Sequence, residues 1–550
     1  MLKTPLIAVL ASVLFVNLSA VGAPAQTAAP GLTLFNPNVD TNTYLMDTNG
    51  QIVHTWSFAG TPGITTYLEE DGTLLRAKKI SGPVSFGGSG GGVERVAFDG
   101  TVLWDFTISN AQEAHHHEAL PLPNGNVLVL VWPIMTNAEA LAAGRDPALL
   151  NGSGFFPEAI VEYQQTGQTT ATEVWRWDVM DHVVQDFDPT KPNFGVVANH
   201  PELVDLNFAP NGSPGGEWLH ANAINYDPVF DQILFSTPFL NELWVIDHST
   251  TTAEAAGSTG GNSGKGGDLL YRWGNPEAYG AGTAADQKLF FQHGGMFIEP
   301  GRPGAGNILV FNNEVPGPPQ HSEVWELTRQ ADSAGNYTLA PGAAFGPAAP
   351  VWSYAAPMPA DLNSTFLSSA ERLPNGNTMI NSGAQAWFFE VTNAGTKVWE
   401  HFNTLPVSGP KVVFKTRRYE RYLFADRHEL SAAAGGSVGF NMVTGTDHAG
   451  ELYLLLGSIS GTTPGLVVDG LTLPLVVDAY FLTTLTQPNQ PPLSQSFGVL
   501  DALGKASASF ALPGGLGVAG ITANHAFVAF DPVAGQVTLV SNAQALSLLP

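Results

Sequence analysis

The chain has 550 residues, of which 44% are hydrophobic and only 13% charged, so it is neither a disordered chain nor a coiled coil. Its formal net charge of −26 argues against a nucleic-acid partner, because a polyanion would be repelled, and the lack of any cysteine rules out disulfides and thiolate sites. The 60 glycines and 40 prolines favour short strands joined by tight turns, which predicts an all-β fold.

Residues 1–25 have the pattern of a signal peptide. Lys3 gives a positive start, Leu6 to Val16 is apolar apart from Ser12, and Ala23-Pro24-Ala25 carries small residues where a signal peptidase reads them. The apolar run is short for a membrane span, and no second one follows it. We therefore expect a periplasmic or secreted protein without stable membrane insertion after cleavage. An uncleaved N-terminal anchor is the alternative.

A turn and a strand recur together through residues 26–425. Leu122 to Asn126, with the sequence Leu-Pro-Asn-Gly-Asn, precedes an apolar strand, and the same five residues return at Leu373 to Asn377. Proline presets the first turn position and Asn-Gly adopts positive φ readily, so each unit is a hairpin turn. A second recurring element is a short polar turn before a tryptophan strand, as in Asp99-Gly100 before Trp104.

Pairing these elements predicts a six-bladed β-propeller over residues 26–425. A closing strand within Lys411 to Phe424 is expected to return to the first blade, and a solenoid is the structural alternative. The expected blades lie near residues 31–60, 64–108, 115–178, 218–274, 292–354 and 365–403.

Residues 430–550 lack the tryptophan units. Their short alternating strands, such as Glu451 to Leu456 and Ala526 to Phe530, predict a small C-terminal β-sandwich module.

Three consecutive blades carry a histidine at a matching point before the turn proline. His116 lies seven residues before Pro123, His293 seven before Pro300, and His220 eight before Pro228. Since equivalent offsets place residues at equivalent points of the innermost strand, the repeat is expected to bring three imidazoles to the propeller axis. His117 is an equal candidate with His116, because alternation along the strand does not settle which ring points inward. A single histidine on a strand is more often structural.

Three converging imidazoles fit two chemistries, which their spacing does not separate. A neutral ring nitrogen can attack a sulfuryl group while neighbouring rings hold its oxygens. Histidine suits this role because its ordinary pKa of about 6.5 keeps both protonation states accessible. The same three nitrogens can instead bind Zn²⁺ with an open fourth position.

Several stretches around these histidines follow one another in a distinctive order. They are His116-His117-Glu118, Gly144 to Pro147, Trp218 to Asn222 before Tyr226-Asp227, Asn241 to His248, Leu289 to Met296, and Asn307 to Asn313. In order and spacing they resemble the bacterial arylsulfotransferase family of six-bladed periplasmic propellers. The resemblance implies that His293 is transiently sulfated, and that His220 with His116 or His117 holds the sulfuryl oxygens. It also implies an aryl sulfate donor, a phenol acceptor, and no metal or nucleotide cofactor.

Three positions depart from the family pattern. The best characterised branch has Ser-x-Arg after the second histidine, where this chain has Ser236-Thr237-Pro238. Losing one such charged donor costs on the order of 3 kcal/mol of transition-state stabilisation. Gly294 stands where relatives often carry a carboxylate, and Glu118 replaces an aspartate. Arg145, Arg176 and Arg272 are the candidates to supply the positive charge of the arginine that Pro238 replaces.

The sequence thus predicts an exported aryl sulfotransferase that works through a sulfohistidine at His293. Two alternatives stay open: a non-catalytic extracellular propeller that binds a sulfated ligand or a protein, and a metal-dependent enzyme with a three-histidine site. A homodimer is compatible with the sequence, which does not specify an oligomeric state.

Overall fold

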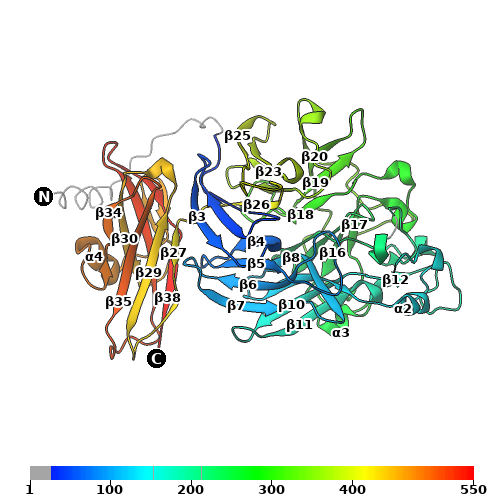
Figure 1. Ribbon diagram of the computed structural model, residues 1–550, viewed down its shortest axis with the longest axis horizontal. Coiled ribbons are helices and arrows are strands. Elements are labelled where there is room, and N and C mark those ends of the chain that lie inside the picture. Colours follow the sequence, from blue (N-terminus) through cyan, green and yellow to red (C-terminus); the bar gives the residue numbers. More distant parts are fainter. Residues whose placement is uncertain (1–26, 153, 212–213) are drawn as a thin grey trace.

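The computed structural model describes residues 27–152, 154–211 and 214–550, so the signal peptide expected at residues 1–25 lies outside the described part. Strands dominate, and the α-helices among these residues are short: α2 (Asn137–Ala142), α3 (Thr252–Ala255) and α4 (Ala479–Thr486). None of the helices described is long and apolar enough to cross a membrane. The predicted all-β class is confirmed. Figure 1 shows the C-terminal strands, in orange and red, beside a larger body made from the rest of the chain.

Between Leu32 and Tyr419 the strands form six four-stranded antiparallel sheets. The first sheet is β26 (Val413–Tyr419), β1 (Leu32–Pro37), β2 (Asn42–Met46) and β3 (Ile52–Ser57), and the second is β4 (Pro62–Leu68), β5 (Leu74–Lys79), β6 (Gly91–Val96) and β7 (Val102–Thr107). The third is β8 (Glu113–Pro121), β9 (Val127–Pro133), β10 (Ala159–Gln165) and β11 (Ala171–Asp178), and the fourth is β14 (Ala223–Asp227), β15 (Gln232–Thr237), β16 (Glu242–Asp247) and β17 (Tyr271–Trp273). The fifth is β18 (His293–Phe297), β19 (Ile308–Val315), β20 (His321–Leu327) and β21 (Trp352–Ala355), and the sixth is β22 (Ser369–Arg372), β23 (Thr378–Ser382), β24 (Trp387–Val391) and β25 (Lys397–Phe402). A small parallel pair, β12 (Val183–Val184) and β13 (Val204–Asp205), lies in the segment between the third and fourth sheets.

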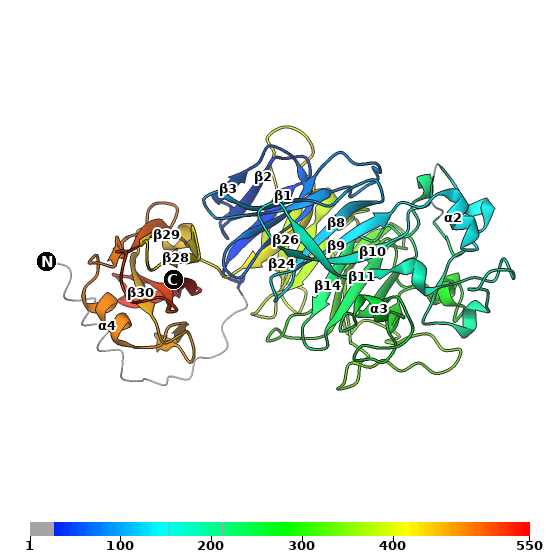
Figure 2. The same cartoon turned by 90° about the horizontal axis from the view of Figure 1, so that it is seen from below.

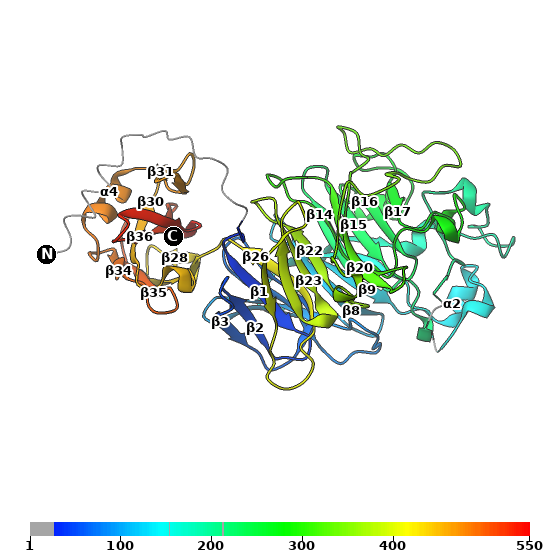
Figure 3. The same cartoon turned by 90° about the horizontal axis from the view of Figure 1, so that it is seen from above.

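The six sheets close into a ring around the innermost strands. Strands β26, β4, β8, β14, β18 and β22 contact one another in a complete cycle. Strand β26 comes from the end of this part of the chain but lies beside β1, as Figure 2 and Figure 3 show. The two strands pair with Arg417 opposite Leu34. The propeller is therefore closed by backbone hydrogen bonds, and a closing strand is found within the predicted Lys411 to Phe424 stretch, at Val413 to Tyr419.

Buried polar contacts tie neighbouring sheets together in a chain that has no disulfide. In three sheets, an asparagine of the first hairpin turn donates to a glutamate of the third strand: Asn126 to Glu162 (2.5 Å), Asn307 to Glu326 (2.6 Å) and Asn377 to Glu390 (2.6 Å). Each glutamate also meets a basic side chain from the following sheet: His248, Arg372 and Arg418, respectively. Because these groups are largely buried, each pair links two sheets at a point that water does not screen.

The C-terminal residues form two sheets with a shared core. One contains β27 (Leu423–Ala425), β29 (Gly436–Val443), β35 (Lys505–Leu512) and β33 (Leu493–Ser494). The other contains β28 (Glu429–Ser431), β38 (Gln544–Leu549), β36 (Thr522–Asp531), β30 (Leu452–Ser458) and β34 (Phe497–Val499), with β37 (Gln536–Val540) paired to β36. A hairpin of β31 (Leu466–Val468) and β32 (Leu471–Leu473) lies outside them. Strand β27, expected at the end of the propeller, instead pairs with β29.

The C-terminal sheets pack directly on the first two propeller sheets. One continuous apolar cluster includes Leu32 and Trp56 from the propeller and Phe424 and Phe527 from the C-terminal strands. The rings of Phe98 and Phe424 stack with centroids 4.3 Å apart. At the edge of this contact, the carboxylate of Asp47 accepts hydrogen bonds from the backbone and the hydroxyl of Thr446.

Candidate active site

His116 and His293 occupy equivalent positions on their strands. His116 of β8 lies opposite Leu130 of β9, and His293 of β18 lies opposite Phe311 of β19. Both strands bulge immediately afterwards, since the register shifts before Ala119 and before Met296. A bulge turns the extra residues out of the regular alternation, so the position after each histidine has an unusual backbone conformation.

That following position explains one departure from the family pattern. It is occupied by His117 with φ 46° in β8 and by Gly294 with φ 63° in β18. A Cβ on Gly294 would lie 2.9 Å from the backbone of Ser369. Because the left-handed conformation and this close approach both favour glycine, the backbone here leaves no room for a carboxylate side chain.

His117 lies beside His220, and Phe414 lies beside both His117 and His293. The rings of His117 and His220 have centroids 4.9 Å apart, and Phe414 from the closing strand lies 5.8 Å from His117 and 6.1 Å from His293. His220 precedes β14 and has a left-handed backbone with φ 51°. The backbone of Gly88, in the loop before β6, lies against the ring of His117.

His116 and His117 are equal candidates from the sequence; in the structure His117 lies beside His220, and His116 lies behind His117. Nδ1 of His116 is 2.9 Å from Nδ1 of His117, and its Nε2 is 2.7 Å from Oε2 of Glu158. Its ring is fully buried and stacks on Trp132 with centroids 3.8 Å apart. Since its ring is fully buried between Glu158, Trp132 and His117, His116 has no atom exposed to a ligand.

Glu158 is a site residue that the sequence analysis missed. It lies just before β10, is fully buried, and its Oε1 accepts hydrogen bonds from Nε1 of Trp132 (3.2 Å) and from the backbone N–H of Ala221 (2.8 Å). Burial raises the pKa of its carboxyl group well above the usual value. Burial also lowers the pKa of His116 and of His117 well below the usual value, and neighbouring histidines add to this effect.

The hydrogen bonds of His293 define its tautomer. Nδ1 lies 2.9 Å from Oδ1 of Asn313 and 3.0 Å from the carbonyl oxygen of Phe291. Asn313 donates its amide protons to the carbonyl oxygens of Ser364 and Leu367, so its Oδ1 is the atom that faces the ring. Both neighbours of Nδ1 are therefore acceptors, and Nδ1 carries the proton.

The other nitrogen of His293 keeps its lone pair. Nε2 accepts a hydrogen bond from the backbone N–H of Leu367 at 3.2 Å. Burial lowers the pKa of His293 to about 4, so the ring is neutral at neutral pH. A neutral imidazole with an unprotonated Nε2 has the electronic form of a nucleophile.

His220 is held by a carboxylate and an aromatic ring. Its Nδ1 lies 2.6 Å from Oε1 of Glu217, and its ring stacks on Phe239 with centroids 4.8 Å apart. Phe239 in turn meets Phe291 edge-on at 6.3 Å. The histidines are thus bordered by the aromatic side chains Phe239, Phe291 and Phe414.

In the described residues, no hydrogen bond or ion pair joins any of these four histidines to a lysine or arginine side chain. Arg176 pairs with Glu113 and Asp178, and Arg272 pairs with the buried Glu242. Arg145 donates to the carbonyl oxygen of Leu206 and stacks near Phe155 and Trp218. None of these three arginines replaces the missing cation by direct contact with the histidines.

The described residues also contain no group of three or more histidine, aspartate or glutamate side chains arranged to hold a metal ion.

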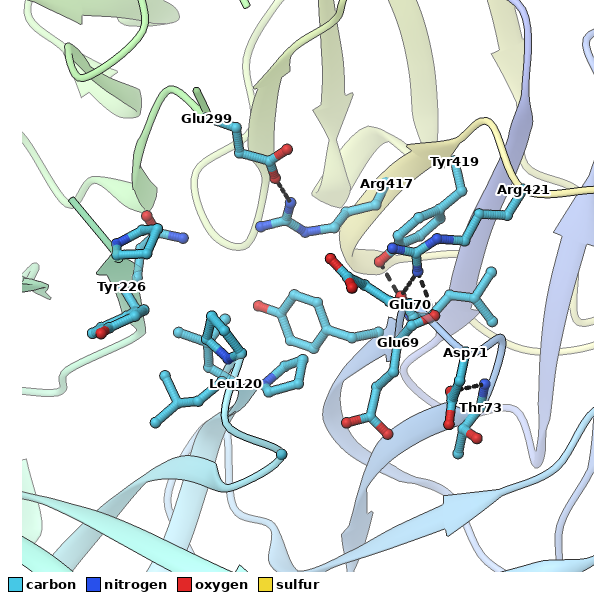
Figure 4. A pocket seen from close by; sticks show the side chains of 18 of the residues that line it. Glu69, Glu70, Asp71, Thr73, Leu120, Tyr226, Glu299, Arg417, Tyr419 and Arg421 are labelled. Carbon is cyan, nitrogen blue, oxygen red and sulfur yellow. Dashed lines mark hydrogen bonds and ion pairs between the residues drawn. The ribbon is translucent and has the colours of Figure 1, made fainter. Parts of the chain in front are cut away.

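A separate cavity of about 820 Å³ lies at the other end of the innermost strands. It is lined by residues at and just after the ends of β4, β8, β14 and β18 and by Arg417, Tyr419 and Arg421 of the closing segment. Figure 4 shows its acidic side chains Glu69, Glu70, Asp71 and Glu299. Its lining contains none of the four histidines. The buried contact of Lys415 with Glu118 (2.6 Å) and Tyr67 (2.8 Å) links the two regions, since Glu118 follows His117 and Tyr67 lines the cavity.

Comparison with known proteins identifies a family. The family model described as arylsulfotransferase (ASST) matches residues 19–422. No curated protein matches the chain significantly. Similar solved structures include a protein of unknown function from Bacteroides caccae (13% identity, 70% of this chain, 98% of that chain, TM-score 0.39) and a streptogramin B lyase (11% identity, 68% of this chain, 79% of that chain, TM-score 0.33). A virginiamycin B lyase from Staphylococcus aureus is similar at 10% identity, over 70% of this chain and 89% of that chain, with a TM-score of 0.32.

Proposed function

The chain belongs to the arylsulfotransferase family, and from this premise we propose that it transfers a sulfuryl group from an aryl sulfate to a phenol through a sulfohistidine at His293. The transfer takes place in the periplasm or outside the cell, as the pattern of residues 1–25 indicates. It needs no metal or nucleotide cofactor.

The observation that carries this proposal is the tautomer of His293. Its Nδ1–H is directed to Asn313 and Phe291, so the lone pair of Nε2 is free of a proton. The neutral form dominates near neutral pH because burial lowers the pKa of this ring to about 4. A histidine that must attack sulfur needs both properties.

The first half-reaction forms an N–S bond and breaks an S–O bond. Nε2 of His293 gives up its hydrogen bond from the backbone N–H of Leu367 and attacks the sulfur of the donor, and the aryl oxide leaves with the electron pair of the S–O bond. The ring keeps its Nδ1–H and therefore gains a positive charge, which offsets one negative charge of the sulfonate. The oxygens of Asn313 and Phe291, which already accept from Nδ1, stabilise this charge as it develops.

In this proposal His220 holds the sulfuryl oxygens, while His117 faces the oxygen that joins the sulfuryl group to the aryl ring. The rings of His117 and His220 lie side by side at 4.9 Å, and the carboxyl group of Glu217, 2.6 Å from Nδ1 of His220, fixes the orientation of that ring. This pair takes the part that an arginine plays in the best characterised branch of the family, where this chain has Pro238.

The second half-reaction returns the sulfuryl group to a phenol. The acceptor oxygen attacks sulfur, the N–S bond breaks, and its electron pair returns to Nε2 of His293. Phe239 and Phe291 are partly exposed beside the histidines, and we propose that the donor ring and the acceptor ring pack against these two side chains.

The test is sulfuryl transfer by the purified protein. With 4-nitrophenyl sulfate as donor, we expect nitrophenolate to be released only when a phenol is added, and His293→Ala to abolish the release. With donor alone, mass spectrometry should find one sulfuryl group on the peptide that contains His293.

His321→Ala is the matched control, because His321 lies on β20 and contacts Pro319 and Glu323 instead of the site. It should retain full activity. If the wild type transfers nothing to a panel of phenols while calorimetry detects binding of aryl sulfates that His293→Ala leaves intact, the protein is a binding propeller and the proposal is wrong.

A further inference from the structure

We propose that Glu158, acting through His116, moves protons to and from His117, so that His117 is the acid and base of the sulfuryl transfer. This inference rests on the proposed function. Glu158 and His116 touch neither donor nor acceptor, and they act by setting which nitrogen of His117 carries a proton.

The geometry forms one unbranched line of hydrogen bonds. Oε2 of Glu158 lies 2.7 Å from Nε2 of His116, and Nδ1 of His116 lies 2.9 Å from Nδ1 of His117. Glu158 and His116 are fully buried, and His117 is only 3% exposed. Among the described residues, Nε2 of His117 has no hydrogen-bond partner, so it is the nitrogen left to face a substrate.

The line is held in place at its buried end. Oε1 of Glu158 accepts from Trp132 and from the backbone of Ala221, which leaves Oε2 for His116. Trp132 also stacks on His116 with an angle of 5° between the ring planes. The carboxyl group and the first ring are therefore fixed by the same indole, and neither can turn without losing several contacts.

A line of this kind has two proton arrangements. Each N···N or N···O hydrogen bond contains one proton, so the position of one proton determines the others. When Glu158 is a carboxylate, Nε2–H of His116 donates to it, Nδ1–H of His117 donates to His116, and Nε2 of His117 is a bare lone pair. When Glu158 is a carboxylic acid, every proton is shifted by one bond, and Nε2 of His117 carries a proton.

Burial favours this relay over a charged imidazole. The pKa values of His116 and His117 are depressed by burial, and His115, His220 and His293 all act on His117 in the same direction. The pKa of Glu158 is raised by burial, and the nearby Glu217 raises it further. A proton that enters at His117 is therefore held more favourably on the carboxyl group than on either ring.

The protons balance over the catalytic cycle. In the first half-reaction, Nε2–H of His117 protonates the departing aryl oxide, one proton shifts along each link, and Glu158 becomes a carboxylate. In the second, the phenol gives its proton to Nε2 of His117 as its oxygen attacks sulfur, and Glu158 becomes a carboxylic acid again. No imidazolium forms on His116 or His117 in either step.

The kinetic test uses Glu158→Gln with donors of different leaving groups. Glutamine fills the same space but neither releases nor takes up a proton. General acid catalysis typically contributes 100-fold or more, so we expect a loss of about 100-fold with phenyl sulfate, whose aryl oxide needs a proton. With 4-nitrophenyl sulfate, whose oxide leaves easily, we expect a loss of less than about 10-fold.

Glu162→Gln is the matched control. Glu162 lies on β10, the strand that follows Glu158, is buried, and also pairs with a histidine, His248, away from the site. Glu162→Gln should change the rate of sulfuryl transfer from phenyl sulfate and from 4-nitrophenyl sulfate by the same factor. An equal loss with both donors in Glu158→Gln would mean that Glu158 is only structural and would overturn the relay.

A spectroscopic test does not depend on turnover. With ¹⁵N-labelled histidine, long-range nitrogen–proton correlations report which nitrogen of each ring is protonated, and His117→Asn identifies the signals of His117. In the wild type, the proton of His117 should move between Nδ1 and Nε2 as pH changes, without an imidazolium signal. In Glu158→Gln it should stay on Nε2 at every pH.

This measurement separates the two proposals. If no donor is turned over but the tautomer of His117 follows Glu158, the relay stands and the transferase function fails. If His117 of the wild type titrates to an imidazolium, or its tautomer is the same in wild type and Glu158→Gln throughout the pH range, the relay is wrong even when sulfuryl transfer is found. The wild-type titration also decides the question if the variant does not fold.

Discussion

Nδ1 of His293 lies 2.9 Å from Oδ1 of Asn313, and the amide nitrogen of Asn313 is in turn bound to the carbonyl oxygens of Ser364 and Leu367. The asparagine therefore connects the proposed nucleophile to the segment before the sixth sheet. It orients the ring without bringing a charge to the site, which is the part a second partner of a histidine usually plays.

Asn313→Ala should slow the formation of the sulfohistidine. Without the amide oxygen, the ring loses one acceptor for Nδ1–H and a stabilising dipole for the charge that develops in the attack. A neutral hydrogen bond contributes about 1 to 1.5 kcal/mol, which corresponds to roughly a tenfold lower kcat. Pre-steady-state release of nitrophenolate measures this step. Asn312→Ala is the control, since Asn312 binds Phe290 and Lys288 instead, and a similar loss there would contradict the assignment.

Gly88→Ala should abolish the activity by displacing His117. Gly88 has φ 82°, and a Cβ built on it falls inside the space of the His117 ring. Gly125→Ala is a close control, because Gly125 has φ 84° but faces open space. Both variants carry the same backbone strain, of about 1 kcal/mol, so thermal unfolding should show similar losses from strain. Activity should be lost only in Gly88→Ala. Equal activity in the two variants would mean that the ring is free to move.

His248 should make the stability of the propeller depend on pH. It lies 2.7 Å from Asp231 and 2.9 Å from Glu162, and these two carboxylates raise its pKa to about 9 against the cost of burial. The unfolded chain loses this proton near pH 6.5, so the stabilisation is fully present below about 6.5 and is lost as pH rises through about 9.

The size of this effect is roughly 3 kcal/mol, taken from the shift of the His248 pKa from 6.5 to about 9. Urea unfolding of the wild type and of His248→Gln at about pH 6 and about pH 10 measures it. The gap between the two proteins should be large at the lower pH and small at the higher one. A gap that does not change with pH would show that the imidazolium is not what joins the third and fourth sheets.

Phe424→Ala should destabilise both parts of the chain together. Phe424 is fully buried and stacks on Phe98, within the apolar cluster that the C-terminal strands share with the first two propeller sheets. Truncating a buried phenylalanine typically costs 3–5 kcal/mol. Val533→Ala, at a side chain that is 95% exposed, should change the unfolding free energy by less than about 0.5 kcal/mol. A loss confined to a separate C-terminal transition would show that the two parts unfold independently.

Local patterns predicted most of the framework. Turn chemistry, as at Leu122 to Asn126, depends on a few adjacent residues, so it located the hairpins. The return of the chain at Lys411 to Phe424 follows from the need of a propeller to close, and strand β26 meets that expectation. The end of β26 was not predicted, because the next strand, β27, follows it closely along the chain but pairs with β29.

The sequence by itself determined the repeat, and with it the equivalent positions of His116 and His293, because the offset from a turn is a local quantity. Only the tertiary structure decided that His117 and not His116 joins His220 and His293, since a bulge between His116 and Ala119 redirects the strand. The tertiary structure also determined the hydrogen-bond partners of these histidines: Glu158, which pairs with His116, lies 42 residues from it, and Asn313, which pairs with His293, lies 20 residues from it. Hydrogen bonds between distant residues depend on which strands become neighbours and where they bulge. The spacing of residues along the sequence predicts neither of these.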